Sequence, residues 1–225
     1  MTSKPLIIFG IGSLAQLAHY YATREMRLQV AAFAVDARFK TVDTMLGLPV
    51  LCWEDQLPEQ YPPQCASMFV AVGYRSMKGR QHAYDRATSA GYDLPSIVSN
   101  AAFIAETARM GSNNFIMPGA VIEPEALLGA NNVVWSNATL CHHTRVGNHN
   151  FFASNVTVGG EVSVGSRNFL GFSSIVLQHK IIGDDTLIAA GSLLTHDAES
   201  LRHYQGSPAR AVMTLDPALG VCVIP

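Results

Sequence analysis

Charged side chains are scarce in this chain. Asp, Glu, Lys and Arg make up 14% of its 225 residues, and the formal net charge is -2. No run of Lys and Arg stands out, so the positive surface that binds a nucleic acid or an anionic membrane is not predicted. Hydrophobic residues make up 48%, which excludes a disordered chain and predicts a compact core.

Cysteines and long apolar runs are also scarce. The four cysteines, Cys52, Cys65, Cys141 and Cys222, show no CxxC spacing and no pairing pattern. Neither a disulfide framework nor a structural zinc site is predicted, and reduced thiols fit a cytoplasmic protein. The first apolar run is too short for a signal peptide, and no window of about 20 apolar residues exists to span a membrane.

The first hundred residues alternate short apolar runs with helical patterns. Five elements are predicted: strands at 6–9, 30–35 and 68–72, and helices at 14–26 and 77–90. Strands that alternate with helices form a parallel sheet with right-handed crossovers. The sequence therefore predicts a small Rossmann-like domain over residues 1–100.

After residue 100 an apolar residue recurs at every sixth position without a slip in register. The positions are Ile104, Met110, Ile116, Ile122, Leu128, Val134, Leu140, Val146, Phe152, Val158, Val164, Leu170, Val176, Ile182, Ile188 and Leu194. Such side chains fit the narrow interior of a left-handed parallel β-helix, stacked about 4.8 Å apart in successive coils. Gly and Asn are expected at the corners because they tolerate positive φ. The predicted β-helix covers 101–205, and a C-terminal tail covers 206–225.

Four aromatic residues lie off this interior register. A triangular prism presents flat faces, and apolar side chains on those faces are typical of contacts between subunits. We therefore expect some of the four to cover such contacts: Trp135, Phe151, Phe169 and Phe172.

The repeat, the N-terminal α/β domain and the ending Gly206-Ser207-Pro208-Ala209-Arg210 together resemble the hexapeptide-repeat acyltransferases. More narrowly, the chain looks like bacterial sugar acetyltransferases with a Rossmann-like domain, which include sialic acid O-acetyltransferases and nucleotide-linked amino-sugar N-acetyltransferases. The resemblance implies that residues 1–100 bind a nucleotide sugar and that the β-helix and the tail bind acetyl-CoA. It also implies a homotrimer with active sites between subunits, no metal, and a role in making lipopolysaccharide or another surface glycan.

The resemblance assigns a general base. The run from Leu140 to Gly147 is similar to a family motif in which a histidine precedes an acid, and it places His142 as the base. An ordinary histidine has a pKa near 6.5, which suits proton acceptance at neutral pH. The alternative is that His142 is a surface residue at a coil corner. Gly160 lies one coil of 18 residues later and matches the family's glycine at the acetyl thioester.

The residue after the base departs from the family, because His143 stands where an Asp or Glu is usual. That acid would orient the imidazole of His142. Glu123 or Glu161 from a neighbouring coil is one candidate for this task. The other possibilities are that His143 itself faces the substrate, that the two histidines share a proton, or that His143 points to solvent.

Small residues of the late coils are expected to keep a CoA groove shallow, and the chain's ending supplies a cation. The predicted CoA contacts are Gly160, Ala189, Ala190, Gly191, Pro208 and Arg210, with Arg210 as a partner for a phosphate.

A glycine-rich turn follows the first strand and opens a helix, which is typical of a pyrophosphate site. The complete GxGxxG motif is absent, so a redox dinucleotide is not indicated. An acid ends the second strand, where it would bind ribose or base. Arg75 or Arg80 could bind a phosphate, although Arg80 on a helix is expected to be solvated. The predicted substrate contacts are Gly10, Gly12, Ser13, Leu14, Asp36, Gly73, Tyr74 and Arg75, and Leu14 stands where related transferases often carry a histidine.

The predicted function is acetyl-CoA-dependent N-acetylation of the 4-amino group of a nucleotide-linked deoxy sugar. Acetylation of a sugar hydroxyl is an alternative, because both acceptors need the same base. A non-catalytic scaffold is another, supported by the missing acid beside His142. A third is a zinc hydro-lyase with three histidine ligands, for which the candidates are His142, His143, His149 and His179.

Overall fold

The computed structural model describes residues 4–223. The ends of the predicted N-terminal domain and C-terminal tail, residues 1–3 and 224–225, lie outside the described residues. The chain divides into two compact units. The first contains 1–73 and 82–97, and the second contains 74–81 and 98–225. A short segment that precedes residue 100 thus belongs to the second unit.

The first unit is built on a five-stranded sheet with the order β3-β4-β2-β1-β5. Its strands are β1 (Leu6–Phe9), β2 (Val30–Val35), β3 (Thr44–Met45), β4 (Leu48–Cys52) and β5 (Ser67–Val70). All run parallel except β3, which pairs antiparallel with β4. The three predicted strands correspond to β1, β2 and β5. Almost all of their side chains are buried, as expected for central strands of a parallel sheet. The short elements β3, β4 and α2 (Gln56–Gln60) were not predicted.

The first predicted helix is divided in two. Helix α1 (Ser13–Tyr20) is followed by a π-helical turn, Tyr21–Glu25, in which the Met26 N–H donates to the Tyr21 carbonyl at 3.1 Å. The chain leaves this wider turn at Arg27, which has a φ of 58°. The other predicted helix is α3 (Met77–Ser89), and a 3-10 turn at Ala37–Phe39 follows β2.

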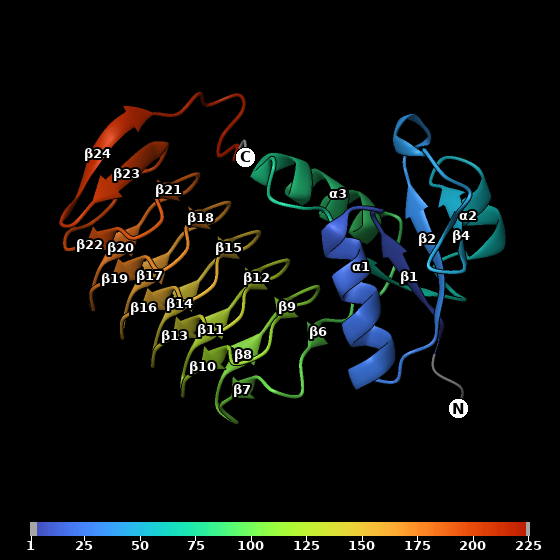
Figure 1. Ribbon diagram of the computed structural model, residues 1–225, viewed down its shortest axis with the longest axis horizontal. Coiled ribbons are helices and arrows are strands. Elements are labelled where there is room, and N and C mark those ends of the chain that lie inside the picture. The colour runs from blue at the N-terminus through green and yellow to red at the C-terminus, as the bar shows by residue number, and fades with distance from the viewer. Residues whose placement is uncertain (1–3, 224–225) are drawn as a thin grey trace. The chain divides into compact units, whose positions relative to one another are not determined.

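The second unit is a parallel β-helix with three sheets, whose coils follow one another in Figure 1. One sheet contains β7 (Phe103–Ile104), β10 (Val121–Ile122), β13 (Thr139–Leu140), β16 (Thr157–Val158), β19 (Ile175–Val176) and β22 (Leu193–Leu194). The next contains β8 (Arg109–Met110), β11 (Leu127–Leu128), β14 (Arg145–Val146), β17 (Ser163–Val164) and β20 (Ile181–Ile182). The third contains β6 (Ile97–Val98), β9 (Phe115–Ile116), β12 (Val133–Val134), β15 (Phe151–Phe152), β18 (Phe169–Leu170), β21 (Leu187–Ile188), β23 (Arg202–Gly206) and β24 (Ala209–Thr214).

The sixth-residue register is confirmed at every coil. Each apolar position from Ile104 to Leu194 is the second residue of a two-residue strand, and each from Ile104 to Val176 pairs with the residue 18 positions later. Ile182 and Ile188 instead pair with Ala198 and Tyr204, 16 positions later. From Ile116 onward all of these side chains are buried, whereas Ile104 and Met110 in the first coil are half-buried. Two-residue strands joined by sharp corners explain why the repeat is six.

The glycines that directly follow the apolar positions were expected to adopt positive φ, but the structure gives a different reason for their presence. Positive φ falls three residues after each apolar position from Met110 to Ile188, at residues such as Asn131 and His143. The glycines instead allow successive coils to approach. A Cβ at Gly147 would lie 2.7 Å from the carbonyl oxygen of Gly165, and one at Gly111 would lie 2.9 Å from the carbonyl carbon of Gly129. The expectation of positive φ is wrong for these glycines.

A ladder of buried asparagines links the coils inside one corner. The backbone N–H of Asn132 donates to Oδ1 of Asn114 at 2.9 Å, and the N–H groups of Asn150 and Asn168 each repeat the bond one coil later at 2.8 Å. The ladder ends at Thr186, whose N–H donates to Asn168. Because these side chains are fully buried, the hydrogen bonds that their Oδ1 atoms accept offset part of the desolvation of the amides.

Arg80 is buried against the β-helix, so the expectation that it is solvated is wrong. Its side chain is 1% exposed, and its Nη2 donates to the carbonyl oxygen of Asn131 at 2.8 Å. Asn131 in turn contacts Nδ1 of His149 at 3.0 Å. Burial lowers the pKa of Arg80 to about 10. The N-terminal turn of α3 is thereby attached to a corner of the coils.

The C-terminal residues extend the third sheet and then return to the start of α3. Strands β23 and β24 form an antiparallel hairpin, and β23 pairs with β21. Further on, the carbonyl oxygen of Val221 accepts from the Met77 N–H at 3.0 Å, and Lys78 donates to the carbonyl oxygen of Pro217. None of the helices within residues 4–223 combines the length and apolar character that a membrane span requires.

Candidate active site

His142 and His143 lie at one corner of the β-helix, between β13 and β14. His143 has a φ of 57°, so the chain turns sharply there, and both side chains are exposed. Nδ1 of His142 lies 3.3 Å from Nδ1 of His143, and the rings meet edge to face with an interplanar angle of 83°. The structure therefore brings the two predicted residues into direct contact.

Gly160 lies against the imidazole of His142, as the 18-residue spacing predicted. A Cβ at position 160 would lie 2.5 Å from Cε1 and 2.6 Å from Nε2 of that ring. The Glu161 N–H donates to the His142 carbonyl at 3.0 Å, which fixes the two coils relative to each other. Any side chain at position 160 would displace the imidazole.

The two carboxylates considered as partners for the base bind other groups. Oε2 of Glu123 accepts from the backbone N–H of His142 at 2.7 Å. The pKa of Cys141 is raised, first by burial and then by the charge of Glu123 and a hydrogen bond to it. Oε2 of Glu161 lies 3.5 Å from Nδ1 of His179. Glu123 thus holds the backbone of the corner, and the imidazole of His142 contacts His143.

The predicted CoA contacts lie on two neighbouring segments. The Ala189 N–H donates to the Tyr204 carbonyl at 2.9 Å, and the Gly206 N–H donates to Oγ of Ser192 at 3.2 Å. The late coil and the hairpin are therefore side by side. The predicted residues on these segments that are exposed are Ala190, Gly191, Pro208 and Arg210.

The glycine-rich turn of the first unit has one structural glycine and one open position. Gly10 has a φ of 129°, and a Cβ there would lie 2.8 Å from the carbonyl oxygen of Ala71. Gly12 is the N-cap residue of α1. A Cβ added at Gly12 would have no heavy atom of the described chain within 4 Å, and the neighbouring Ser13 is exposed. Leu14 is 7% exposed and belongs to the core, which leaves little of its surface for a ligand.

Asp36 forms an ion pair with Arg86, a partner that the sequence did not reveal. The guanidinium of Arg86 lies over the rings of Trp53, at 4.3 Å, and Phe9, at 5.1 Å. A cation held between aromatic faces is oriented as well as charged. The sequence carries no local signal for this cluster, because its members come from β1, the loops after β2 and β4, and α3.

Three of the predicted substrate contacts, Gly73, Tyr74 and Arg75, are divided between the two units. Gly73 ends a segment of the first unit, whereas Tyr74 and Arg75 belong to the second. The ring of Tyr74 lies 5.0 Å from that of Phe151 and 5.6 Å from that of Phe169. Trp135 stacks on Phe151 at 5.5 Å. Phe151 and Phe169 are buried within the chain and need no subunit to cover them, whereas Phe172 is exposed.

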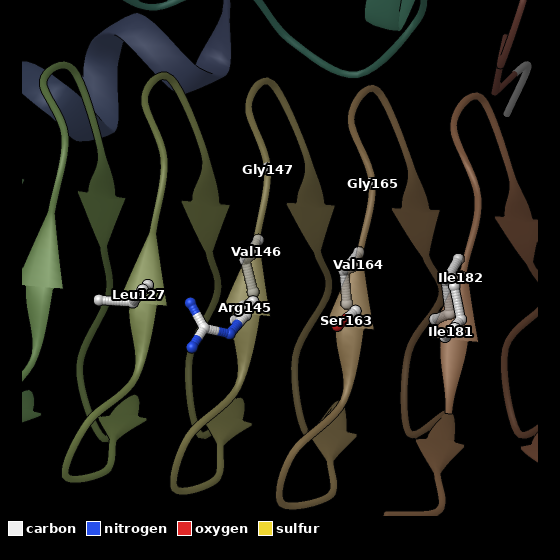
Figure 2. Close-up of a pocket in the computed structure, with 9 residues that line it drawn as sticks. All are labelled: Leu127, Arg145, Val146, Gly147, Ser163, Val164, Gly165, Ile181 and Ile182. Atoms are coloured by element: carbon white, nitrogen blue, oxygen red, sulfur yellow. The ribbon is translucent and has the colours of Figure 1, made fainter. Parts of the chain in front are cut away.

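A shallow groove crosses the sheet that follows the His142 corner. Figure 2 shows Leu127, Arg145, Ser163 and Ile181 in one row on successive strands, where they face outward beside the groove. Leu127 is 38% exposed and Ile181 57%. Arg145 lies two residues after His143, so the groove borders the predicted site.

Within the described part of the chain, no group of three or more His, Cys, Asp or Glu side chains has a geometry that could hold a metal ion. All four cysteines are free thiols.

Comparison with known proteins agrees with this architecture. A family model described as bacterial transferase hexapeptide (six repeats) matches residues 107–142. A search of curated protein sequences finds no significant match. The structure of PerB from Caulobacter crescentus, solved with CoA and GDP-perosamine, is 26% identical, with a TM-score of 0.84 over 94% of this chain and 99% of that chain.

The fold is that of the hexapeptide-repeat sugar acetyltransferases. The predicted fold class, the resemblance and the assignment as an acyltransferase are therefore confirmed. Perosamine N-acetyltransferase from the same organism, solved with a histidine replaced by asparagine, is also 26% identical, with a TM-score of 0.85 over 94% of this chain and 98% of that chain. The acetyltransferase domain of PglB from Neisseria gonorrhoeae, solved with acetyl coenzyme A, shares the fold at 19% identity, with a TM-score of 0.84 over 94% of this chain and 100% of that chain.

Proposed function

We propose that this protein transfers the acetyl group of acetyl-CoA to the amino group of a nucleotide-linked 4-amino deoxy sugar, with His142 as the general base. The observation that carries the proposal is the imidazole of His142 held against Gly160, a position without a side chain. The similarity to PerB, which was solved with CoA and GDP-perosamine, supports this class of acceptor.

The reaction needs one base and one leaving group. As the acceptor nitrogen attacks the thioester carbonyl, a C–N bond forms, and Nε2 of His142 takes one amine proton. The C–S bond then breaks, and the thiolate of CoA takes the proton from His142, which restores the neutral base. Because Gly160 has no side chain, the imidazole can lie directly against the backbone of the next coil.

We propose that the first unit binds the nucleotide. Backbone N–H groups at Gly12 and Ser13 open α1 and suit a pyrophosphate. The ion pair of Asp36 and Arg86 lies at the carboxyl ends of the strands, where an open parallel sheet usually binds its ligand. The exposed groups of the late coil and hairpin, including Arg210, are proposed for CoA, and Arg210 suits one of its phosphates.

We also propose a homotrimer. The exposed Leu127 and Ile181 lie on one flat sheet of the β-helix, and flat apolar faces of this kind are typical of contacts between copies. Sedimentation of the purified chain measures this directly. A monomer at micromolar concentration would contradict it. A cytoplasmic location and a role in surface glycan synthesis remain part of the proposal.

The activity is tested by free thiol release from acetyl-CoA with a panel of acceptors. The panel contains GDP-perosamine, other nucleotide-linked 4-amino sugars, and matched sugars with a hydroxyl in place of the amine. Turnover is expected with an amino acceptor and is expected to fall about 100-fold or more in His142→Ala, because general base catalysis contributes roughly 10²–10⁴. Turnover with hydroxyl acceptors alone would indicate O-acetylation. Full activity in His142→Ala would refute His142 as the base.

A further inference from the structure

The imidazole of His142 has a second imidazole as its partner. Nδ1 of His142 and Nδ1 of His143 are 3.3 Å apart, within hydrogen-bonding distance. A hydrogen bond between two imidazole nitrogens needs one protonated and one unprotonated nitrogen. The contact therefore couples the tautomer of one ring to the tautomer of the other.

One of the two possible arrangements suits a base. When Nδ1 of His142 carries the hydrogen and donates to His143, Nε2 of His142 keeps its lone pair and can accept a proton. When Nδ1 of His143 donates instead, Nε2 of His142 carries the hydrogen and cannot act as a base. Nε2 is also the nitrogen that lies against Gly160.

The backbone holds His143 in a fixed place. Its φ is 57°, and its N–H donates to the carbonyl oxygen of Pro124 at 3.1 Å. The same corner position is occupied by Glu125 in the preceding coil and by Glu161 in the following coil, with His179 one coil further. An imidazole thus alternates with a carboxylate along this corner.

The other ionisable groups near the pair are already engaged or point elsewhere along the coil. Glu123 accepts from the His142 N–H, and Glu161 pairs with His179. Cys141 lies beside Glu123, and Arg145 is exposed on the sheet that follows. Within residues 4–223, the hydrogen-bonding partner of the His142 imidazole is therefore His143.

We propose that His143 is a positioning residue that holds His142 in the tautomer with hydrogen on Nδ1. It takes the place of the acid that the family resemblance led us to expect. This inference rests on the proposed function, because it assumes that Nε2 of His142 accepts the amine proton. His143 does not touch the substrate in this scheme, and it accepts a hydrogen bond from His142 throughout the transfer.

The pairing makes activity sensitive to a single proton on either ring. When His143 is protonated, both of its nitrogens are donors, so its Nδ1 donates to His142 and forces the inactive tautomer. A proton on His142 itself blocks Nε2. Activity is therefore expected to require that both rings be neutral. The carboxylates of Glu125 and Glu161 occupy the same corner position in the coils before and after His143.

Three substitutions separate positioning from packing. Asn at 143 places a neutral oxygen near the Nδ1 position and tolerates positive φ, Asp places a charged oxygen there, and Ala removes the acceptor. At about pH 8, kcat is expected to stay within about twofold in His143→Asn and to fall about tenfold in His143→Ala, with KM values unchanged. In His143→Asp the acid limb of the pH profile is expected to move up by about one pH unit, because a carboxylate stabilises the imidazolium.

His179→Ala is the matched control. His179 occupies the same corner with a φ of 58° but contacts Glu161, so this variant has the same backbone strain without affecting the base. Its kcat is expected to equal that of the wild type. Equal kcat values in His143→Asn and His143→Ala would overturn the proposal, and so would an unshifted acid limb in His143→Asp.

A spectroscopic readout separates this inference from the proposed function. Long-range proton–nitrogen spectra of histidine-labelled protein report which ring nitrogen carries hydrogen, without any substrate. We expect hydrogen on Nδ1 of His142 in the wild type and in His143→Asn, and on Nε2 in His143→Ala. Hydrogen on Nε2 in an active wild type would overturn the inference alone. Hydrogen on Nδ1 in a wild type that acetylates no acceptor would overturn the proposed function and leave the pairing intact.

Discussion

Gly160→Ala is expected to abolish most of the activity while leaving the fold intact. The new methyl group would lie 2.5 Å from Cε1 and 2.6 Å from Nε2 of His142, well inside van der Waals contact. Gly160 has no positive φ, so alanine adds no backbone strain. The atoms that must move belong to the end of an exposed side chain, and the imidazole can rotate into solvent.

The substitution is expected to cost little folding stability but much catalytic activity. Turning the His142 side chain away costs about 0.5–1.5 kcal/mol in rotamer energy, a small fraction of the stability of a domain. Loss of the base from its position costs roughly 10²–10⁴ in rate, which corresponds to about 3–5 kcal/mol in the activation free energy. We therefore expect kcat to fall at least about 100-fold while the midpoint of thermal unfolding changes by a few degrees at most.

Gly147→Ala is the contrasting variant. A Cβ there would lie 2.7 Å from the carbonyl oxygen of Gly165, and backbone cannot rotate away. Stability is expected to fall by about 1–3 kcal/mol, measured by urea unfolding. In the double variant Gly160→Ala with His142→Ala, the alanine at 160 should add no further loss of rate. Near-normal kcat in Gly160→Ala, or a second full loss in the double variant, would refute this reasoning.

Three other outcomes are expected. Asn150→Ala removes the acceptor of the Asn168 N–H inside the buried ladder and should lower the free energy of unfolding by about 2–3 kcal/mol in urea titrations; an unchanged midpoint would contradict this. Asp36→Asn should weaken nucleotide binding about tenfold by calorimetry, because the orientation of Arg86 depends on the carboxylate. Burial lowers the pKa of His203, so the unfolded chain binds this proton at a higher pH than the folded chain. Stability should therefore fall as the pH drops below about 6.5, and His203→Leu should reduce this pH dependence in unfolding measured at several pH values.

The β-helix was predictable because its physical cause is local and periodic. One apolar side chain in six fills the interior, so the register from Ile104 to Leu194 could be read without any tertiary information. The same spacing placed Gly160 one coil after His142, and the structure puts them in contact. In the first unit, strands β1, β2 and β5 were predicted from their apolar runs, whereas the short β3, β4 and α2 carry too few residues for a pattern.

Arg80 shows where local reasoning fails. A charged residue on a polar helix is usually solvated, and its burial against Asn131 depends on how the first turn of α3 packs on a corner of the β-helix. Tyr74 likewise packs on Phe151 from a distant part of the chain. The ion pair of Asp36 and Arg86 joins residues 50 positions apart, which no local pattern reveals.

The sequence alone determined the repeat, the fold class and the histidine to be tested, because each depends on spacing along the chain. The tertiary structure decided which groups meet. It assigned the glycines to close approach between coils, Glu123 to the backbone of the corner, and His143 to the imidazole of His142. These contacts depend on the direction in which each side chain leaves the backbone at a corner, and spacing does not specify that direction.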